Sequence, residues 1–347
     1  MRQKSRGQQA LLFKPAAQGL GHGHFDKLTW QFYDNGNEIV SDYGAARFLN
    51  VEAKSGGGYL PENNTFAKQT VAHNTVVVDE QSHFNGKVKT GNKHHPEVLF
   101  FANTKQGSIS SAKIDTAYES VSLKRTLALV KLPNIKKPLA IDIFDVASDE
   151  KSHQYDLPLH YQGQLIDTSF TLSTQTDSLS ALGQKNGYQH LWLTAKAQPK
   201  KGLAKITWLN DNGKFYTQTA LVDGETDVLF TRIGANDPHF NLRNESGFVY
   251  RKEATKQHTF ISILEPHGQY NPSKEFTVAA KSTIETMSHS IKGEIELVEI
   301  GLVTGQRYLL AFNRTITEKQ SNTFTYQTNK FSFNGRFKLF ELSNEEK

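Results

Sequence analysis

Short stretches in which apolar and polar residues alternate recur along the whole chain, and they are rich in β-branched and aromatic side chains. Clear examples are 75–78, 120–123, 139–144 and 294–300. Alternation with a period of two residues is typical of β-strands that bury one face. No apolar stripe with helical spacing continues beyond two turns, so we expect few and short helices.

Asn-Gly and Asp-Gly pairs mark turns between these segments. They occur at Asn35-Gly36, Asn85-Gly86, Asn212-Gly213, Asp223-Gly224 and Asn334-Gly335. Such residues supply the positive φ angles of tight turns, so these pairs predict hairpins between antiparallel strands. We therefore predict an all-β fold, a large antiparallel multi-stranded β-sandwich. A closed barrel is less favoured because the predicted strands are uneven in length.

The domain organisation is simple. No stretch rich in Pro, Gly or Ser is long enough to separate two domains. We expect residues 1–20 to be a lead or the remnant of an interdomain linker, and residues 21–347 to form one β-sandwich domain. The densest chemistry follows directly after this short lead, so we expect the chain to be the second half of a larger protein.

Composition excludes several classes of protein. A chain of 347 residues with 37% hydrophobic and 22% charged content is not intrinsically disordered. No apolar run approaches the roughly 18 residues of a membrane-spanning helix. The absence of cysteine excludes disulfides and leaves His, Asp and Glu as the strong metal ligands. A net charge of +5 without dense basic clusters favours an anionic partner over a nucleic acid.

Chemistry-bearing residues concentrate between residues 21 and 74. In an extended segment, His22 and His24 of Gly21-His22-Gly23-His24 project to the same face, which suits one ion or one substrate. Solvated pairs of this kind are also common in loops. A third ligand must come from another segment. Our preferred candidates are Asp42 and His73, because two imidazoles and a carboxylate suit zinc. Asp26 is the local rival.

Hairpin geometry constrains that ligand set. If Asn35-Gly36 closes a regular hairpin, Tyr33 faces Glu38, and a continuous ladder would keep His24 several residues away from Asp42. A metal shared by His24 and Asp42 requires the ladder to end near Leu28. The glycines at positions 21, 23 and 44 permit such a break.

A hydrolase of the metallo-β-lactamase type is a weaker alternative. Residues His22 to Asp26 imitate the first five positions of its His-x-His-x-Asp-His motif, but Lys27 replaces the final histidine. That fold also needs layers of helix, for which the chain shows no pattern.

The same segments resemble the C-terminal part of the heparinase II/III-like polysaccharide lyases, most closely the oligoalginate lyases of polysaccharide lyase family 17. The order and spacing of the first four groups match together, and the last two are supportive. The matching residues are His22-Gly23-His24-Phe25-Asp26-Lys27-Leu28, Ser41-Asp42-Tyr43-Gly44-Ala45-Ala46-Arg47-Phe48, Gly58-Tyr59-Leu60-Pro61-Glu62-Asn63, Gln69-Thr70-Val71-Ala72-His73-Asn74-Thr75-Val76, His153-Gln154-Tyr155-Asp156 and Gly234-Ala235-Asn236-Asp237-Pro238.

The resemblance implies an N-terminal (α/α) toroid followed by a large β-sandwich, with the active site between them. These 347 residues match the sandwich alone. By the same resemblance, His24, Asp42 and His73 hold one structural zinc ion, and His22 and Arg47 face the substrate.

The implied activity is β-elimination on a uronate-containing polysaccharide, most closely alginate oligomers, in the periplasm or outside the cell. Tyr59 is the implied catalytic residue of this chain. The family's other catalytic tyrosine and an Asn-His pair belong to the toroid, which we expect upstream. The alternative is a stand-alone, non-catalytic carbohydrate-binding or structural β-sandwich.

Other polar residues have structural interpretations. We interpret His83 and His94-His95 as surface loop residues. Tyr155, His160 and Tyr161 alternate with apolar residues, which is typical of sandwich core or edge positions.

Overall fold

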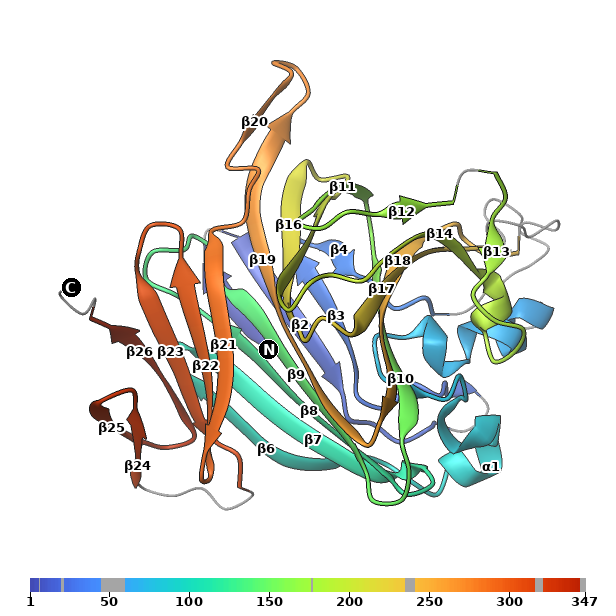
Figure 1. The fold of residues 1–347 in the computed structure, drawn as a ribbon, viewed down its shortest axis with the longest axis horizontal. Coiled ribbons are helices and arrows are strands. Elements are labelled where there is room, and N and C mark those ends of the chain that lie inside the picture. The colour runs from blue at the N-terminus through green and yellow to red at the C-terminus, as the bar shows by residue number, and fades with distance from the viewer. Residues whose placement is uncertain are drawn as a thin grey trace.

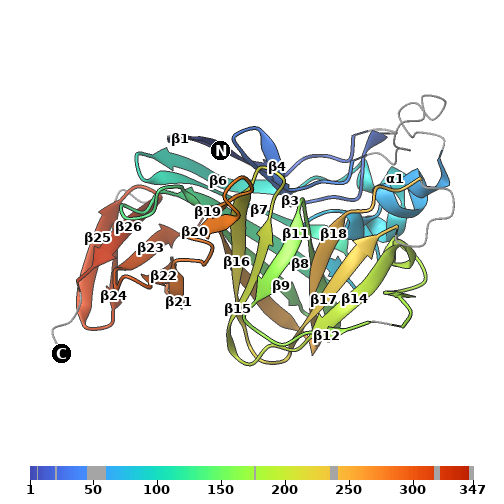
Figure 2. The same cartoon turned by 90° about the horizontal axis from the view of Figure 1, so that it is seen from above.

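The computed structural model describes residues 1–5, 7–19, 22–44, 60–175, 177–234, 241–315 and 321–343. Two large antiparallel sheets pack face to face, and smaller sheets lie at one end of the molecule, opposite the short helical turns (Figures 1 and 2). The predicted all-β antiparallel sandwich with few short helices is therefore confirmed.

The first large sheet has the strand order β1-β2-β3-β4-β10-β18-β17-β14-β12, and β5 and β13 pair with β10 and β14. Its strands are β1 (Arg2–Ser5), β2 (Gly7–Lys14), β3 (Thr29–Asp34), β4 (Asn37–Val40), β5 (Val77–Val78), β10 (His153–Tyr161), β12 (Ser173–Thr174), β13 (Ser180–Ala181), β14 (Leu191–Ala197), β17 (Thr226–Ile233) and β18 (Ser246–Thr255).

The second large sheet has the order β11-β15-β16-β19-β9-β8-β7-β6, with β20 paired to β19. Its strands are β6 (Glu97–Thr104), β7 (Gly107–Tyr118), β8 (Val121–Val130), β9 (Leu139–Ser148), β11 (Gln164–Thr168), β15 (Gly202–Leu209), β16 (Lys214–Val222), β19 (Gln257–Asn271) and β20 (Phe276–Val278).

The smaller sheets follow towards the C-terminus. One has the order β21-β22-β23-β26, and the other pairs β24 with β25. Their strands are β21 (Ile284–Lys292), β22 (Ile295–Leu302), β23 (Arg307–Asn313), β24 (Ser321–Tyr326), β25 (Asn329–Asn334) and β26 (Phe337–Leu342).

The main core lies between the two large sheets, because alternate residues of each strand point inward. Trp30 and Phe32 of β3 meet residues such as Leu127 and Trp208 of the opposite sheet, all nearly inaccessible to solvent. A second core joins the outer face of β9 and β19 to β22 and β23. The sandwich therefore buries both faces of the β8–β9–β19 region, which makes it a rigid platform.

Helical turns gather beside one end of the first sheet. They are a π-helical turn (Asn63–Ala67), 3₁₀ turns (Thr70–Ala72, His83–Gly86 and Tyr188–His190) and the one-turn α1 (Val88–Gly91). Among the described residues, none of the helices has the length and apolar character needed to cross a membrane.

The turn predictions hold only in part. Asn35-Gly36 and Asn212-Gly213 close the hairpins β3–β4 and β15–β16. Asn85-Gly86 instead belongs to a 3₁₀ turn, and Asp223-Gly224 and Asn334-Gly335 connect strands of different sheets. The glycines of all five pairs have positive φ. Such a pair thus fixes the local backbone, but not which strand pairs with which.

The segment expected to be a lead carries strands. Residues 2–5 and 7–14 form β1 and β2, and β2 pairs with β3 along its length from Gln9 to Lys14. The polar residues of this segment hid the alternation because β2 exposes Leu12 and Lys14 while it buries Gln9 and Leu11.

Buried histidines predict a loss of stability in acid. Burial lowers the pKa of His258 on β19 to about 4, and its ring packs edge-on against Phe260 at 4.4 Å. The unfolded chain binds a proton at this site near pH 6.5, whereas the folded chain resists it. The stability from neutral His258 is present above pH 6.5 and is lost as the pH falls towards 4.

We expect His258→Gln to remove about one proton from the acid dependence of unfolding, worth roughly 3 kcal/mol at most. Urea titrations of both proteins between pH 7 and 4 measure this difference. The exposed His95→Gln is the control and should leave the slope unchanged. Equal slopes for His258→Gln and the parent would contradict the assignment.

Candidate metal centre

Three segments meet at the open end of the β3–β4 hairpin. They are residues 22–28 before β3, residues 41–44 after β4, and the helical turns that lead to Asn74. The β3–β4 ladder ends at Phe32 and Val40 after a register shift, with Tyr33 opposite Glu38. The break required for His24 to meet Asp42 is therefore present.

Local backbone explains the glycines of this region. A Cβ on Gly23 would lie 1.4 Å from the carbonyl oxygen of Gln18, so only glycine fits between the two histidines. Gly44 has φ +70°, and its amide donates to Asp42 Oδ1 at 3.3 Å. This turn fixes the Asp42 side chain at the strand end.

The three predicted ligands lie in one cluster. The ring centroids of His24 and His73 are 5.2 Å apart, and His73 Nδ1 lies 2.8 Å from Asp42 Oδ1. Asp26 joins them, because ligand atoms of His24, Asp26 and His73 all lie within 4.8 Å of one another. The ligand atoms that converge are thus those of His24, His73 and the rival Asp26, and Asp42 joins them through its contact with His73 Nδ1.

Electrostatics in the cluster follow from burial and pairing. Burial, reinforced by His73, lowers the pKa of His24 to about 4. Burial opposes charge on His73 and Asp42 as well, but their mutual attraction raises the pKa of His73 and lowers the pKa of Asp42. His24 therefore offers a neutral imidazole, the form that binds a metal.

The donor set fits a zinc ion. His73 is fully buried, and its Nε2 is a buried atom without a hydrogen-bond partner in the described structure. When Nδ1–H donates to Asp42, Nε2 presents a lone pair towards the cluster, as in carboxylate–histidine–metal arrangements. Two imidazoles and a carboxylate are ordinary zinc ligands.

The two carboxylates differ in their other partners. Asp26 receives a hydrogen bond from Lys14 and lies 3.9 Å from the Lys27 ammonium group. Burial lowers the pKa of Lys27 to about 8. Asp42 faces His73 instead. Asp26 thus converges with the two histidines but is already paired with cations, whereas Asp42 contacts the cluster through His73 Nδ1.

We expect the purified chain to carry about one zinc ion. His73→Ala and Asp42→Asn should each weaken zinc binding by more than about a hundredfold, whereas Asp26→Asn should retain the metal. Mass spectrometry of metal content after dialysis measures this. The exposed His95→Ala is the control. Full retention by His73→Ala would remove His73 from the ligand set, and loss by Asp26→Asn alone would exchange the two carboxylates.

The predicted substrate-side residues are placed only in part. His22 is exposed, two residues before His24. Arg47 and Tyr59 lie outside the described residues. Sequence reasoning missed Lys14, the cation that pairs with Asp26, because a lysine at a strand end carries no pattern of its own.

The structure also describes the histidines and tyrosines for which the sequence predicted a purely structural role. His83, interpreted as a surface loop residue, is fully buried, and its Nδ1 accepts a hydrogen bond from the Lys27 amide at 3.3 Å. The surface interpretation of His83 was therefore wrong, because its turn packs against the backbone of Lys27 and places the buried Phe84 beside it. Tyr155, His160 and Tyr161 of β10 are buried, as predicted for core positions.

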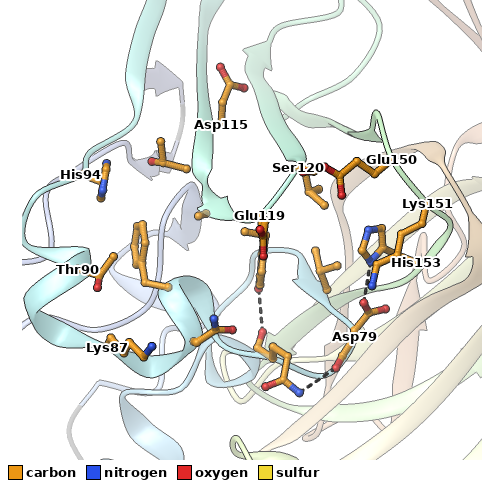
Figure 3. Close-up of a pocket in the computed structure, with 18 residues that line it drawn as sticks. Asp79, Lys87, Thr90, His94, Asp115, Glu119, Ser120, Glu150, Lys151 and His153 are labelled. Carbon is orange, nitrogen blue, oxygen red and sulfur yellow. Dashed lines mark hydrogen bonds and ion pairs between the residues drawn. The ribbon is translucent and has the colours of Figure 1, made fainter.

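A cavity of about 780 Å³ lies beyond the His83–Gly86 turn and not at the metal centre (Figure 3). His153 Nδ1 lies 2.6 Å from Asp79 Oδ2 in its wall, and carboxylates and lysines from several turns surround it. None of the described ligand candidates lines this cavity. This cavity is therefore separate from the candidate metal centre.

The chain is similar to known proteins along most of its length. Residues 2–274 match the family model described as heparinase II/III-like, C-terminal. The chain is 46% identical over 314 residues, 90% of its length, to an exo-oligoalginate lyase of Saccharophagus degradans, of which this covers 42%. It is 45% identical over 94% of its length to an alginate lyase of Stenotrophomonas maltophilia, of which this covers 44%.

Among solved structures, a heparan sulfate lyase from Pedobacter heparinus matches 89% of the chain with a TM-score of 0.59 at 12% identity, over 40% of that protein. A heparinase III matches 88% with a TM-score of 0.57. The chain thus spans less than half the length of these relatives. Both the family model and the sequence identity give the same result: the chain belongs to the heparinase II/III-like C-terminal family.

Proposed function

We propose that this chain is the β-sandwich part of a polysaccharide lyase that cleaves uronate chains, most closely alginate oligomers and from their ends, by β-elimination. The observation that supports this best is the cluster of His24, Asp26 and His73, with Asp42 in contact with His73 Nδ1, in a chain that aligns with two alginate lyases along nine tenths of its length. An N-terminal toroid upstream would complete the cleft.

β-Elimination makes three demands. The uronate carboxylate must be neutralised, the C5 proton removed, and the departing 4-O oxygen protonated. In the proposal, Arg47 and His22 face the carboxylate and Tyr59 transfers a proton at the leaving oxygen. The toroid would supply the remaining tyrosine and an Asn-His pair.

The metal centre has a positioning role in this proposal. Zinc, when bound by His24, Asp42 and His73, would supply a fixed positive charge that ties three segments together. Asp42 Oδ1 lies 2.8 Å from His73 Nδ1 and holds that ring in place. Gly44, whose amide donates to Asp42, precedes the segment that contains Tyr59. Acting on an extracellular polymer, the enzyme would work in the periplasm or outside the cell.

The test uses the full-length protein with its upstream region. Tyr59→Phe should lower kcat by at least about a hundredfold with little change in KM, because a phenol that transfers a proton cannot be replaced by a phenyl ring. The ultraviolet absorbance of the new C4–C5 double bond measures turnover. Tyr326→Phe, on the distant β24, is the control and should leave turnover unchanged.

Three other experimental outcomes would change the proposed function. Unchanged turnover with Tyr59→Phe would make Tyr59 a loop anchor. Oligouronate binding by the full-length protein without unsaturated products would reject the lyase and favour a carbohydrate-binding β-sandwich. Turnover that depends on His24 without the toroid would favour a zinc hydrolase.

A further inference from the structure

A second cavity lies at the base of the β19–β20 hairpin, which projects from the body of the sandwich (Figure 1). Its volume is about 410 Å³. Its walls are the loop between β8 and β9, the start of β16, the hairpin itself, and Thr283 before β21. None of these segments contributes to the metal centre. We call this cavity the hairpin pocket.

The hairpin pocket is built on anchored backbone. His267 Nε2 lies 2.8 Å from Thr217 Oγ1, and its Nδ1 lies 2.9 Å from the carbonyl oxygen of Ala279. The imidazole also stacks on Phe215 at 6.1 Å. Gly268 has φ +46°, and a Cβ there would lie 2.1 Å from the Ala279 oxygen. The hairpin is thus fixed in place at its base, so the pocket is preorganised.

The charge of the pocket is positive. Lys136, Lys137 and Lys214 line it, and Glu265 is the acidic residue among its lining residues. The Glu265 carboxylate is fully buried and keeps its negative charge, since its partners Ser282 Oγ at 2.6 Å and the Thr283 amide at 3.0 Å are neutral donors, but three lysines outnumber it. Its lysines therefore leave an excess of positive charge for an anionic ligand.

One of the three lysines forms an ion pair, one is exposed, and one donates to a neighbouring amide. Lys137 pairs with Asp34 at the end of β3. Lys136 is exposed, and the Lys214 ammonium donates to Gln269 Oε1 at 3.1 Å. Ammonium groups beside an amide are suited to bind a sugar carboxylate and its hydroxyl groups.

The register of the hairpin adds an apolar surface. Gln269 pairs with Val278 and Asn271 with Phe276, while Tyr270 pairs with Thr277. Because side chains alternate across a strand, Phe276 shares the face of Gln269 and Val278, which line the pocket, and Tyr270 lies on the opposite face. Phe276 does not itself line the pocket, but it is 45% exposed on the same face of the hairpin, two residues from Val278.

We propose that the hairpin pocket is a second binding site for acidic oligosaccharide chains, separate from the cleft at the metal centre. Lys136 and Lys214 bind the sugar carboxylates, and Phe276 and Val278 contact the apolar face of a pyranose ring. Charge complementarity selects this occupant. The identity of the sugar as a uronate chain rests on the proposed function.

The position of the pocket suggests its use. Lys137 ties the pocket to Asp34, beside the closed end of the β3–β4 hairpin, whereas Asp42 follows the open end of the same hairpin. The two sites thus lie at opposite ends of one rigid ribbon. A polymer held at the pocket stays near the cleft, which raises its local concentration there.

The test is calorimetric titration of the 347-residue chain with an alginate hexasaccharide. The double variant Lys136→Glu/Lys214→Glu and the variant Phe276→Ala should each weaken binding by at least about tenfold, and added salt should weaken it further. Tyr270→Ala, on the opposite face, and Lys200→Glu, on a distant loop, are matched controls and should bind as the parent does. Neutral cellohexaose should not bind.

Unchanged affinity of the pocket variants, or equal binding of the neutral sugar, would overturn the proposal. A dimer in sedimentation that Phe276→Ala dissociates would instead make this face a contact between copies. The proposed lyase can fail separately: loss of hexasaccharide binding by the variants without any cleavage by the full-length protein would keep the pocket and reject the lyase. Cleavage with normal binding by the variants would reject the pocket alone.

Discussion

Arg125→Met is expected to lower the free energy of unfolding by about 3–5 kcal/mol, because it leaves a buried carboxylate without its partner. Arg125 on β8 is 1% exposed. Its Nε and Nη2 donate to the two oxygens of Asp142 on β9 at 2.8 and 2.6 Å, a bidentate pair. Methionine fills a similar volume but returns none of these hydrogen bonds.

The same guanidinium joins the candidate metal centre to the second sheet. Arg125 Nη1 donates to the carbonyl oxygens of Leu28, at 2.8 Å, and Asn74, which belong to two of the three segments that form the cluster. Its Cζ lies 4.7 Å from the centroid of the Phe144 ring. We therefore expect Arg125→Met to weaken zinc binding as well as folding.

Urea titration with metal analysis of the folded fraction measures both effects. Arg125→Lys keeps the charge but loses the forked geometry, so its loss of stability should be intermediate. Lys113→Met on the neighbouring β7 removes an exposed ion pair with Asp115 and should change stability by less than about 0.5 kcal/mol. A change below about 1 kcal/mol for Arg125→Met would contradict this account.

Much of the site was accessible from sequence because it depends on local geometry. The Asn35-Gly36 turn sets the β3–β4 register, and Tyr33 opposite Glu38 follows from it. The glycines around His24 and Asp42 signal a break in that ladder. These local features predict that His24 and Asp42 lie at the same end of the hairpin, without knowledge of any tertiary contact.

The supports of the site were not accessible, because they depend on contacts between distant segments. Alternation places Arg125 on the buried face of β8 between Leu123 and Leu127, but it does not identify the oxygen atoms that accept hydrogen bonds from a buried arginine there. His83 lies between Ser82 and Phe84 and is buried because its turn folds against Lys27. Likewise, Asp223-Gly224 turns the chain as expected but sends it to another sheet. Periodicity reports which faces are apolar, not which polar groups the tertiary fold will cover.

Asn74→Ala is the second variant for which we expect a large loss of stability, about 3–5 kcal/mol, from three buried backbone groups that lose their partners. The side-chain Nδ2 of Asn74 donates to the carbonyl oxygens of Trp30 at 2.9 Å and Ser41 at 2.7 Å. Its Oδ1 accepts from the His160 amide at 2.8 Å. Strands β4 and β10 pair only at Val40 and Tyr161 in the described sheet, and Asn74 bridges them where they separate.

Two matched variants separate the side-chain hydrogen bonds from shape. Asn74→Asp keeps the volume and the acceptor for His160 but removes both donors, so carboxylate oxygens would face two carbonyl oxygens and stability should fall as far as in Asn74→Ala. Asn37→Ala removes an exposed turn amide and should cost less than about 1 kcal/mol. Denaturant unfolding at neutral pH measures all three variants. If Asn74→Asp were as stable as the parent, the two donated hydrogen bonds would not hold the strands together.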